Sequence, residues 1–396
     1  MKPLPSLKNA AWLNEPRLQE VMAVITRGGG DVRVAGGAVR NALLGVPIAD
    51  VDLATTMLPA DVMRVCKAAG FGVHPTGFEH GTVTVVNKGV PFEVTTLRRD
   101  VETDGRRAVV AFTSDWQEDA ARRDFTMNAI YCTAQGKIYD FTNGYTDLLR
   151  NRVKFVGAAS DRIKEDYLRI LRFFRFHAQF GKGAPDRLGL AACAKHKASL
   201  KKISAERIRR EMVKLVVAPR GVPTLKVMAA SGVLKIIIPY TDDWRLMGRL
   251  PDDSVLRLFA LARKPETLKD VLRLSNVQAE RIDSLMVAPD LSPRLRPSEQ
   301  RAMLYQMDKQ AWVDAVALNW AKGKAAKNDQ KWQALIDLPQ HWPIPKLPVS
   351  GKDLIQAGVA SGPHLGEVLR NLEDWWVAKD FAPTRDELLE RLKNDA

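Results

Sequence analysis

The sequence predicts an α+β protein, in which a small mixed sheet near the N-terminus is followed by all-helical domains. Short β-branched runs, at residues 32–34, 82–86 and 90–97, alternate with glycines and helix-prone segments. Later segments, such as residues 165–176 and 205–212, have helical spacing of apolar positions. A chain of 396 residues is too long for one typical core, so two to four domains are expected.

Four domains are predicted along the chain. Residues 1–140 form the mixed-sheet head, residues 141–220 a basic helical neck, residues 221–290 a helical body and residues 291–396 a helical tail.

The composition predicts a cytoplasmic protein. Apolar residues make up 46% of the chain, yet no window approaches 18 uninterrupted apolar residues, and residues 1–14 lack the hydrophobic run of a signal peptide. Three widely spaced cysteines, Cys66, Cys132 and Cys193, fit neither a disulfide framework nor a zinc site. We expect no membrane partner, and nothing in the sequence indicates a protein partner.

Positive charge is concentrated in the predicted neck. Residues 150–220 contain 19 Lys and Arg against 6 Asp and Glu, which accounts for nearly all of the chain's net charge of +14. A surface that needs only solubility would mix charges of both signs. We therefore expect a polyanionic partner along this segment, with a nucleic acid backbone as the natural candidate and a solvated basic surface as the alternative.

Residues 34–55 combine two chemical features. Gly36 and Gly37 precede a helix, where backbone N–H groups can approach a phosphate, and Arg40 adds a cation one turn later. Asp50 and Asp52 are two apart on an expected strand, so both carboxylates leave one face and can share a divalent ion such as Mg²⁺. Each feature is common without function. Their separation of about a dozen residues fits strand, helix and return strand, and together they indicate metal-dependent phosphoryl or nucleotidyl transfer.

The next segments complete the predicted head. Residues 58–69 are expected to be helical, and residues 82–97 form a hairpin around Asn-Lys-Gly. Glu93 lies on this hairpin and can reach the aspartate pair if its strand is adjacent; alternatively it pairs with Arg98 or Arg99. Residues 98–111 are highly charged, so we expect a mobile loop.

Residues 118–129 are predicted to be helical. On a helix, Arg123, Asp124 and Asn128 lie near a common edge, while Phe125 and Ala129 face the core. The alternative is an exposed helix with internal salt bridges.

Residues 165–176 are predicted to form one amphipathic helix with arginines at positions 169, 172 and 175. Cytosine and adenine each present an amino donor beside a ring-nitrogen acceptor, whereas uracil and guanine present the reverse. A carboxylate accepts and a guanidinium donates, so Asp166 beside Arg169 complements C and A and mismatches U and G. The alternative is a core helix in which this pair forms a salt bridge worth a few tenths of a kcal/mol.

The pattern Gly-Gly-x-Val-Arg-x-x-Leu-Leu-Gly followed by Asp-x-Asp, and the string Arg-Arg-Asp-Phe-Thr-Met-Asn-Ala, resemble the polymerase β nucleotidyltransferase superfamily. The resemblance is to its bacterial-type (class II) branch, the tRNA CCA-adding enzymes and bacterial poly(A) polymerases. One departure is Asn41, where this branch commonly has Asp.

The resemblance implies roles for the motif residues. The implied metal ligands are Asp50 and Asp52, with Glu93 as a third catalytic carboxylate. By the same resemblance Arg123 contacts the nucleotide and Asp124 its ribose. The motif Glu-Asp-x-x-Arg acts as an amino-acid template for CTP and ATP. The implied nucleotide-binding residues are Gly36, Gly37, Arg40, Arg123, Asp124, Asn128, Asp166, Arg169, Arg172 and Arg175.

The predicted function is template-independent addition of C and A to the 3′ end of tRNA, with Mg²⁺ as cofactor and tRNA contacts in the tail. A bacterial poly(A) polymerase is the close alternative. Those relatives carry Gly-Arg-Arg-Phe after the Asp-x-Asp strand, where this chain has the CCA-type residues Pro75-Thr76-Gly77 and His80-Gly81-Thr82. An alternative of another class is a non-catalytic RNA-binding protein with a degenerate nucleotide site.

Overall fold

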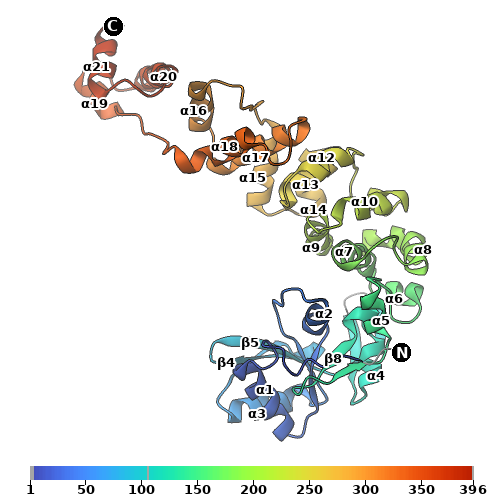
Figure 1. Cartoon of the computed structure of the whole chain (residues 1–396). Coiled ribbons are helices and arrows are strands. Elements are labelled where there is room, and N and C mark those ends of the chain that lie inside the picture. Colours follow the sequence, from blue (N-terminus) through green and yellow to red (C-terminus); the bar gives the residue numbers. More distant parts are fainter. Residues whose placement is uncertain (1–3, 105–106, 395–396) are drawn as a thin grey trace. The chain divides into compact units, whose positions relative to one another are not determined.

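A computed structural model describes residues 4–104 and 107–394 (Figure 1). The chain divides into two compact units, with the division after Pro239. The α+β prediction is confirmed, because a mixed sheet lies in the first unit and the second unit is helical in its described residues.

The sheet of the first unit has seven strands in the order β3-β4-β5-β2-β1-β8-β9. Its strands β2 and β5 pair in parallel, and the other neighbours are antiparallel. The strands are β1 (Val32–Ala35), β2 (Leu53–Thr55), β3 (Gly72–Gly77), β4 (Thr82–Asn87), β5 (Val90–Thr96), β8 (Ile130–Cys132) and β9 (Ile138–Asp140). The predicted hairpin is β4–β5, and Lys88 and Gly89 at its turn have φ of +47° and +79°, as a tight hairpin turn requires.

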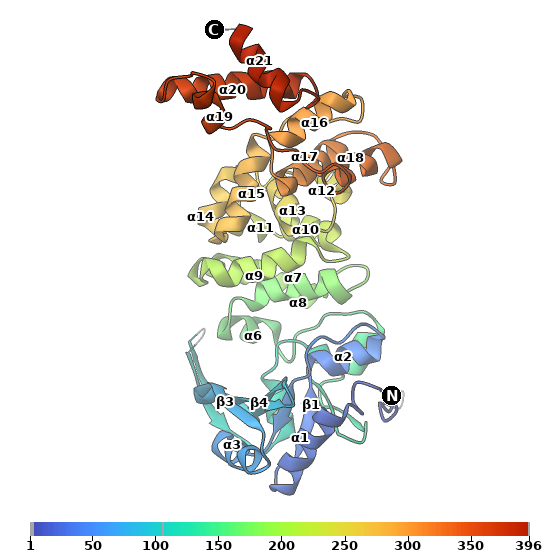
Figure 2. The same ribbon diagram turned by 90° about the vertical axis from the view of Figure 1, so that its left-hand side faces the viewer.

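Helices α1 (Pro16–Arg27) and α3 (Pro59–Ala68) pack on the sheet (Figure 2). Helix α1 buries Leu18, Val21 and Ile25 at helical spacing. The opposite end of β1 leads into α2 (Gly37–Leu44), which lies away from α1 and α3 (Figure 2).

The segment expected to be a mobile loop contains two strands instead, β6 (Arg98–Asp104) and β7 (Arg107–Phe112), which form a separate antiparallel pair. Alternating charged residues provided no apolar signal for strands, but backbone pairing between the two strands supplies their hydrogen bonds. The expectation of a loop was therefore wrong for the described part of this segment, while its mobility remains a prediction.

The remaining helices of the first unit follow the sheet in sequence. Helices α7 and α9 pack against each other. Phe173 of α7 forms a buried aromatic cluster with Phe125 and Phe155. The elements are α4 (Trp116–Ala121), α5 (Gly144–Leu149), α6 (Ala159–Glu165), α7 (Arg169–Phe180), α8 (Arg187–His196), α9 (Ala205–Val216), α10 (Gly221–Ala230) and α11 (Leu234–Ile237), with 3₁₀ turns η1 (Phe78–His80), η2 (Thr126–Asn128) and η3 (Lys197–Lys202).

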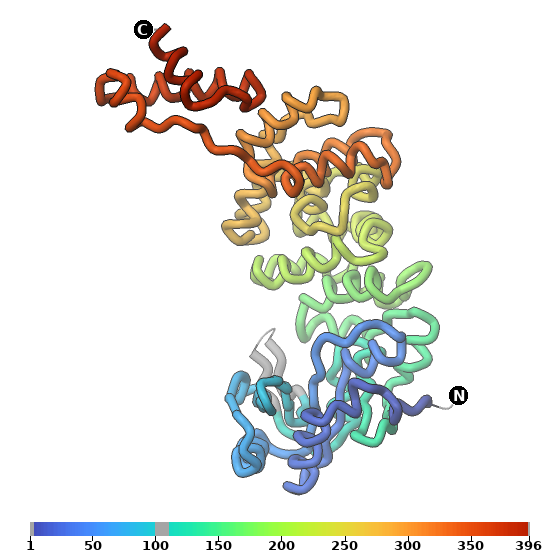
Figure 3. Tube along the Cα trace, turned by 60° about the vertical axis from the view of Figure 1, so that its left-hand side comes forward, coloured from blue at the N-terminus to red at the C-terminus, as the bar shows by residue number. Residues whose placement is uncertain are grey.

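The second unit contains two apolar clusters. One surrounds Trp312, whose indole Nε1 donates to the Leu335 carbonyl at 2.8 Å, and the other surrounds Leu354 and Trp376. An extended segment joins the two clusters after α18 (Figure 3). The elements are α12 (Trp244–Arg249), α13 (Ser254–Leu261), η4 (Pro265–Thr267), α14 (Leu268–Leu272), α15 (Asn276–Met286), α16 (Pro297–Tyr305), α17 (Lys309–Lys322), α18 (Gln330–His341), α19 (Gly351–Gln356), α20 (Pro363–Ala378) and α21 (Arg385–Asn394).

Within residues 4–104 and 107–394, none of the helices has the length and apolar character needed to cross a membrane.

Candidate active site

The turn between β1 and α2 requires glycine at its first position. Gly36 has φ of +67°, a conformation that disfavours side chains, and its N–H donates to the Ile130 carbonyl at 3.0 Å. A Cβ atom there would lie 3.2 Å from Arg123 Nη1 and 3.3 Å from the Asn128 carbonyl oxygen. The first-turn N–H groups of α2, beginning at Gly37, have no acceptor within the helix, so this end suits an anion.

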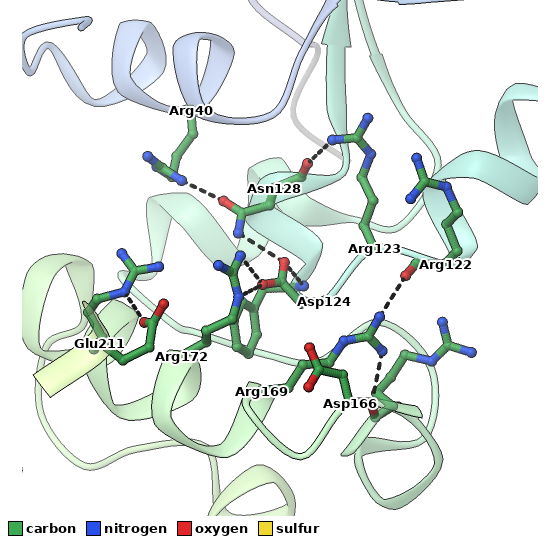
Figure 4. A network of polar contacts seen from close by, with 12 residues as sticks. Arg40, Arg122, Arg123, Asp124, Asn128, Asp166, Arg169, Arg172 and Glu211 are labelled. Carbon is green, nitrogen blue, oxygen red and sulfur yellow. Dashed lines mark hydrogen bonds and ion pairs between the residues drawn. The ribbon is translucent and has the colours of Figure 1, made fainter. Parts of the chain in front are cut away.

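Arg40 lies one turn into α2 and is 8% exposed. Its guanidinium donates to Asn128 Oδ1 at 2.5 Å (Figure 4). It also donates to Asn41 Oδ1 at 2.8 Å and lies 4.3 Å from the centre of the Phe180 ring. Burial and the positive charge of Arg175 lower the pKa of Arg40 to about 10. Arg40 therefore remains charged at neutral pH, held mainly by neutral amide oxygens. Asn41 lies at the position where the bacterial-type (class II) branch commonly has Asp.

Asp50 and Asp52 precede β2 rather than lying on it, so the expectation that a strand orients both of them was wrong. Asp52 still extends the pairing, because its carbonyl accepts from the Ala35 N–H at 2.9 Å. Leu53 pairs with Val94 in parallel register, which brings Glu93 beside Asp52. Burial, followed by the negative charges of Glu93 and Asp50, raises the pKa of Asp52. The three predicted carboxylates are thus electrostatic neighbours.

These carboxylates suit a hard divalent cation. Among the residues that the structure describes, no three His, Cys, Asp or Glu side chains are close enough to hold a metal ion by themselves. Mg²⁺ commonly takes one or two carboxylates and completes its shell with water and substrate phosphates. The mutual repulsion at Asp52 would be relieved by such an ion, so the donor set of Asp50 and Asp52 fits Mg²⁺ bound together with a nucleotide.

A helix was predicted over residues 118–129, but α4 ends at Ala121. Residues 123–129 instead form a bend followed by the 3₁₀ turn η2. The predicted grouping nevertheless holds. Asn128 Nδ2 donates to Asp124 Oδ1 at 3.1 Å, and Arg123 Nη1 donates to the Asn128 carbonyl at 3.3 Å (Figure 4). The backbone bends because Phe125 pairs with Phe155 in an isolated bridge.

Asp119 was not predicted from the sequence. It is 1% exposed and accepts from Arg122 Nε at 2.8 Å, Arg123 Nη2 at 3.1 Å and Tyr131 Oη at 2.7 Å. Burial alone would raise the pKa of Asp119, but Arg123 and Arg122 outweigh it and lower that pKa. Arg123 Nε also donates to Tyr131 Oη at 3.0 Å, so Asp119 and Tyr131 fix Arg123 from behind.

Asp124 is the centre of a second network. Its carboxylate accepts from Arg172 Nε at 2.7 Å and from Asn128 (Figure 4). Burial opposes its ionisation, yet Arg172 and Asn128 keep the pKa of Asp124 below its usual value. Arg175 pairs instead with Glu211 of α9. Asp124 Oδ1 also accepts from the Phe125 N–H at 2.8 Å, and both Nε and Nη2 of Arg172 contact Oδ2, so groups of the chain itself occupy most of the acceptor sites of this carboxylate.

The predicted single helix over residues 165–176 is interrupted. Helix α6 ends at Glu165, and α7 begins at Arg169, so Asp166 lies in extended backbone between them. Asp166 pairs with Arg207 of α9 at 2.7 Å rather than with Arg169. Arg169 Nη1 donates to Glu165 Oε2 at 2.5 Å and to the Arg162 carbonyl at 2.9 Å, and its Nη2 donates to the Arg122 carbonyl at 3.3 Å.

One cavity of about 450 Å³ joins these parts. Asp52, Asp166 and Arg169 all contribute to its wall, so the predicted metal site and the predicted base-selecting pair face one space. Asp50, Glu93 and Arg175 are not among its described lining residues. The lining residues are Ala35, Gly36, Gly37, Arg40, Asp52, Arg122, Arg123, Asp124, Asn128, Asp166, Leu168, Arg169, Arg172, Phe176 and Arg207.

Arg122 and Arg207 were not predicted to line the site. Arg207 belongs to residues 205–212, for which the sequence predicted a helix and no contact with the site, and the only available signal was the cluster of arginines at positions 207, 209 and 210.

A glycine turn and a group of carboxylates beside a mixed sheet, together with an arginine-rich cavity, define a nucleotidyltransferase. Family models agree: the Poly A polymerase head domain matches residues 32–154, the RNA and SrmB-binding site of polymerase A matches residues 189–245, and tRNA nucleotidyltransferase domain 2 matches residues 255–392. The chain belongs to the CCA tRNA nucleotidyltransferases, or CCA-adding enzymes.

Relatives of known name cover nearly the whole chain. The CCA tRNA nucleotidyltransferase 1, mitochondrial, of Danio rerio is 35% identical over 389 residues, which span 91% of this chain and 87% of that protein. The CCA-adding enzyme of Latilactobacillus sakei is 31% identical, with 94% of this chain and 96% of that protein covered. The crystal structure of the Bacillus stearothermophilus CCA-adding enzyme in complex with CTP has a TM-score of 0.81 at 29% identity, covering 96% of this chain and 98% of that chain. The predicted family and enzyme class are confirmed, and this family is generally dependent on divalent metal ions.

Proposed function

We propose that this chain adds C and A from CTP and ATP to the 3′ end of tRNA, using Mg²⁺ and releasing pyrophosphate. The observation that carries the proposal is the single cavity lined by Asp52, Asp166 and Arg169. The proposal includes a division into four domains after residues 140, 220 and 290. It also includes a tRNA-binding role for the tail and a cytoplasmic location.

The reaction is a nucleotidyl transfer. The tRNA 3′-oxygen forms a bond to the α-phosphorus, the bond from that phosphorus to the pyrophosphate oxygen breaks, and the 3′-hydroxyl proton leaves. Mg²⁺, when held by Asp50 and Asp52, supplies charge neutralisation of the phosphates and activation of the hydroxyl. In this proposal Glu93 accepts the proton, a role supported by the parallel register of β2 and β5, in which Glu93 lies beside Asp52. Arg40 and the first-turn N–H groups of α2 bind the triphosphate.

Base selection follows from unused hydrogen-bonding capacity. Asp166 accepts from the Leu168 N–H through Oδ1 and from Arg207 through Oδ2, and a carboxylate has about four acceptor sites. Arg169 uses three of its five donors on Glu165, Arg162 and Arg122 within the described chain. The amino group of C or A can therefore donate to Asp166 while Arg169 donates to the ring nitrogen. Uracil and guanine leave these groups unpaired, which costs about 1–3 kcal/mol for each group.

The defining assay supplies tRNA that ends before CCA with Mg²⁺ and with CTP, ATP, UTP and GTP singly and together. Extension by C, C and A alone is expected. Long A tails would identify the poly(A) polymerase alternative, and tRNA retention without any incorporation would identify a non-catalytic RNA-binding protein.

Two substitutions test the predicted metal ligands. Asp50→Asn and Asp52→Asn should each abolish incorporation, because each removes a charged oxygen ligand, while tRNA binding measured without nucleotide stays near that of the parent. Asp61→Asn on α3, a partly exposed carboxylate paired with Arg64, is the matched control and should leave turnover unchanged. Unchanged turnover in either of the first two variants removes that residue from the proposed site.

A further inference from the structure

A second cavity of about 310 Å³ lies in the first unit. Its walls come from residues 150–153, residues 182–187 and the end of α7, and it shares no described lining residue with the active-site cavity. Its charged and titratable lining residues are Arg150, Arg152, His177, Lys182, Asp186 and Arg187. We call it the basic cavity.

The basic cavity carries a positive charge that its own residues do not neutralise. Four cationic side chains line it against one carboxylate, that of Asp186, which is 8% exposed and pairs with Arg152. Burial and the nearby charge of Arg220 lower the pKa of His177 to about 4, so His177 is neutral at pH 7. Arg220 also donates to the Gly183 carbonyl at 3.5 Å, which adds another cation near this loop.

The backbone that carries these cations is held in place. The Lys182 N–H donates to the Asn151 carbonyl at 3.0 Å, which ties the two loops together. Asn151 and Gly183 both have positive φ, at +50° and +66°, so each loop makes a defined turn. Gly181 packs directly on His177: a Cβ atom at position 181 would lie 2.2 Å from His177 Nδ1.

We propose that the basic cavity binds a phosphate of the tRNA backbone, a contact that rests on the proposed function but is separate from the nucleotide site. Lys and Arg bind phosphates by charge, without information about base sequence. No Phe, Tyr or Trp is among the described lining residues, so the cavity offers no surface on which a base could stack. This favours backbone contact over binding of a free nucleotide. The proposed contact also assigns part of the positive charge in residues 150–220 to a specific partner, a phosphate of the tRNA backbone.

The test compares two charge-reversal pairs in the same segment. Lys182→Glu with Arg187→Glu alters the cavity, and Lys154→Glu with Lys164→Glu places the same charge change outside its lining. Binding of tRNA lacking CCA is measured by filter retention, without nucleotide, from 50 to 300 mM salt. The cavity pair should raise Kd about tenfold or more at 100 mM salt and reduce the log–log salt slope by about 1, as expected for the loss of one phosphate contact. The control pair should stay within about twofold, and the KM for CTP at saturating tRNA should not change.

The outcomes are distinct from those of the proposed function, because binding is read without catalysis. Lys182→Gln with Arg187→Gln should weaken tRNA binding to an intermediate degree, and thermal unfolding of all variants verifies folding. Equal weakening by both charge-reversal pairs would overturn the proposal, since it would show a diffuse field. Unchanged tRNA binding in the cavity pair would also overturn the proposal. This holds even if inorganic phosphate raises the Tm of the parent and not that of the cavity pair, because the cavity would then bind a free anion only.

Discussion

Asp119→Asn is expected to destabilise the first unit and to weaken nucleotide use. The carboxylate is 1% exposed and accepts from Arg122, Arg123 and Tyr131. An amide of the same shape turns an NH₂ donor toward these donors. Removing one partner of a buried ion pair costs roughly 3–5 kcal/mol. Because the side chains of Arg122 and Arg123 are 17% and 21% exposed, the expected cost falls to about 2–3 kcal/mol.

The functional part of this loss passes through Arg123, which lines the active-site cavity. If Arg123 loses about 1.4 kcal/mol of its interaction free energy with the bound nucleotide, kcat/KM falls about tenfold. We therefore expect KM for both CTP and ATP to rise about tenfold, with tRNA binding unchanged. The Tm of the transition that includes the first unit should fall by roughly 5–10 °C.

Tyr131→Phe provides the graded comparison. It removes one hydroxyl while the pairs from Asp119 to both arginines remain, so a loss of about 1 kcal/mol is expected. Glu118→Gln, the same chemical change one position earlier on α4, is the control and should behave like the parent. Circular dichroism melting and steady-state kinetics with tRNA lacking CCA measure both effects. If Asp119→Asn keeps its Tm within 1 °C and its KM for CTP within twofold, Asp119 does not position Arg123.

Three further changes have definite expected outcomes. Gly36→Ala forces a side chain into φ of +67° beside Arg123, so kcat/KM should fall about tenfold in the same assay, with unchanged tRNA retention. Arg207→Gln releases Asp166, and the preference for CTP over UTP should fall about fivefold in competition assays; an unchanged preference would separate Arg207 from base selection. His177 has a pKa of about 4 when folded against about 6.5 unfolded, so the unfolded chain binds more protons between these values. Stability should therefore fall as pH drops from about 6.5 toward 4, by up to about 3 kcal/mol, and His177→Gln should remove this dependence in urea unfolding.

Local sequence patterns were sufficient for the parts of the site that local geometry builds. The turn at Gly36 and the helix after it follow from glycine placement and an apolar run, and α2 ends at Leu44 before a left-handed Gly45. The hairpin that carries Glu93 follows from Asn-Lys-Gly between β-branched runs. In each case, the residues that determine the conformation are neighbours in the sequence.

Long-range partners could not be predicted in the same way. Asp166 was expected to act with Arg169 at helical spacing, but its ion-pair partner is Arg207, 41 residues away. The burial of Asp119 could not be predicted, because the sequence pattern around it is that of an exposed helix. Nothing in that pattern indicates that Tyr131 contacts this carboxylate. Burial of a charge depends on tertiary packing, which the periodicity of one segment does not contain.

The electrostatics of the active-site cavity explain why so many arginines can be gathered in it. Six arginines and three aspartates are among its described lining residues, an excess that the phosphates of a nucleotide can neutralise. Two of these arginines are oriented by neutral acceptors: Arg40 by two amide oxygens, and Arg169 partly by the Arg162 and Arg122 carbonyls. Neutral acceptors fix a guanidinium without cancelling its charge, so the site is preorganised for an anion before one arrives. For Arg40, Asn41 supplies one of these neutral acceptors, whereas an aspartate in the same contact would supply a negative charge of the kind that the triphosphate is expected to bring.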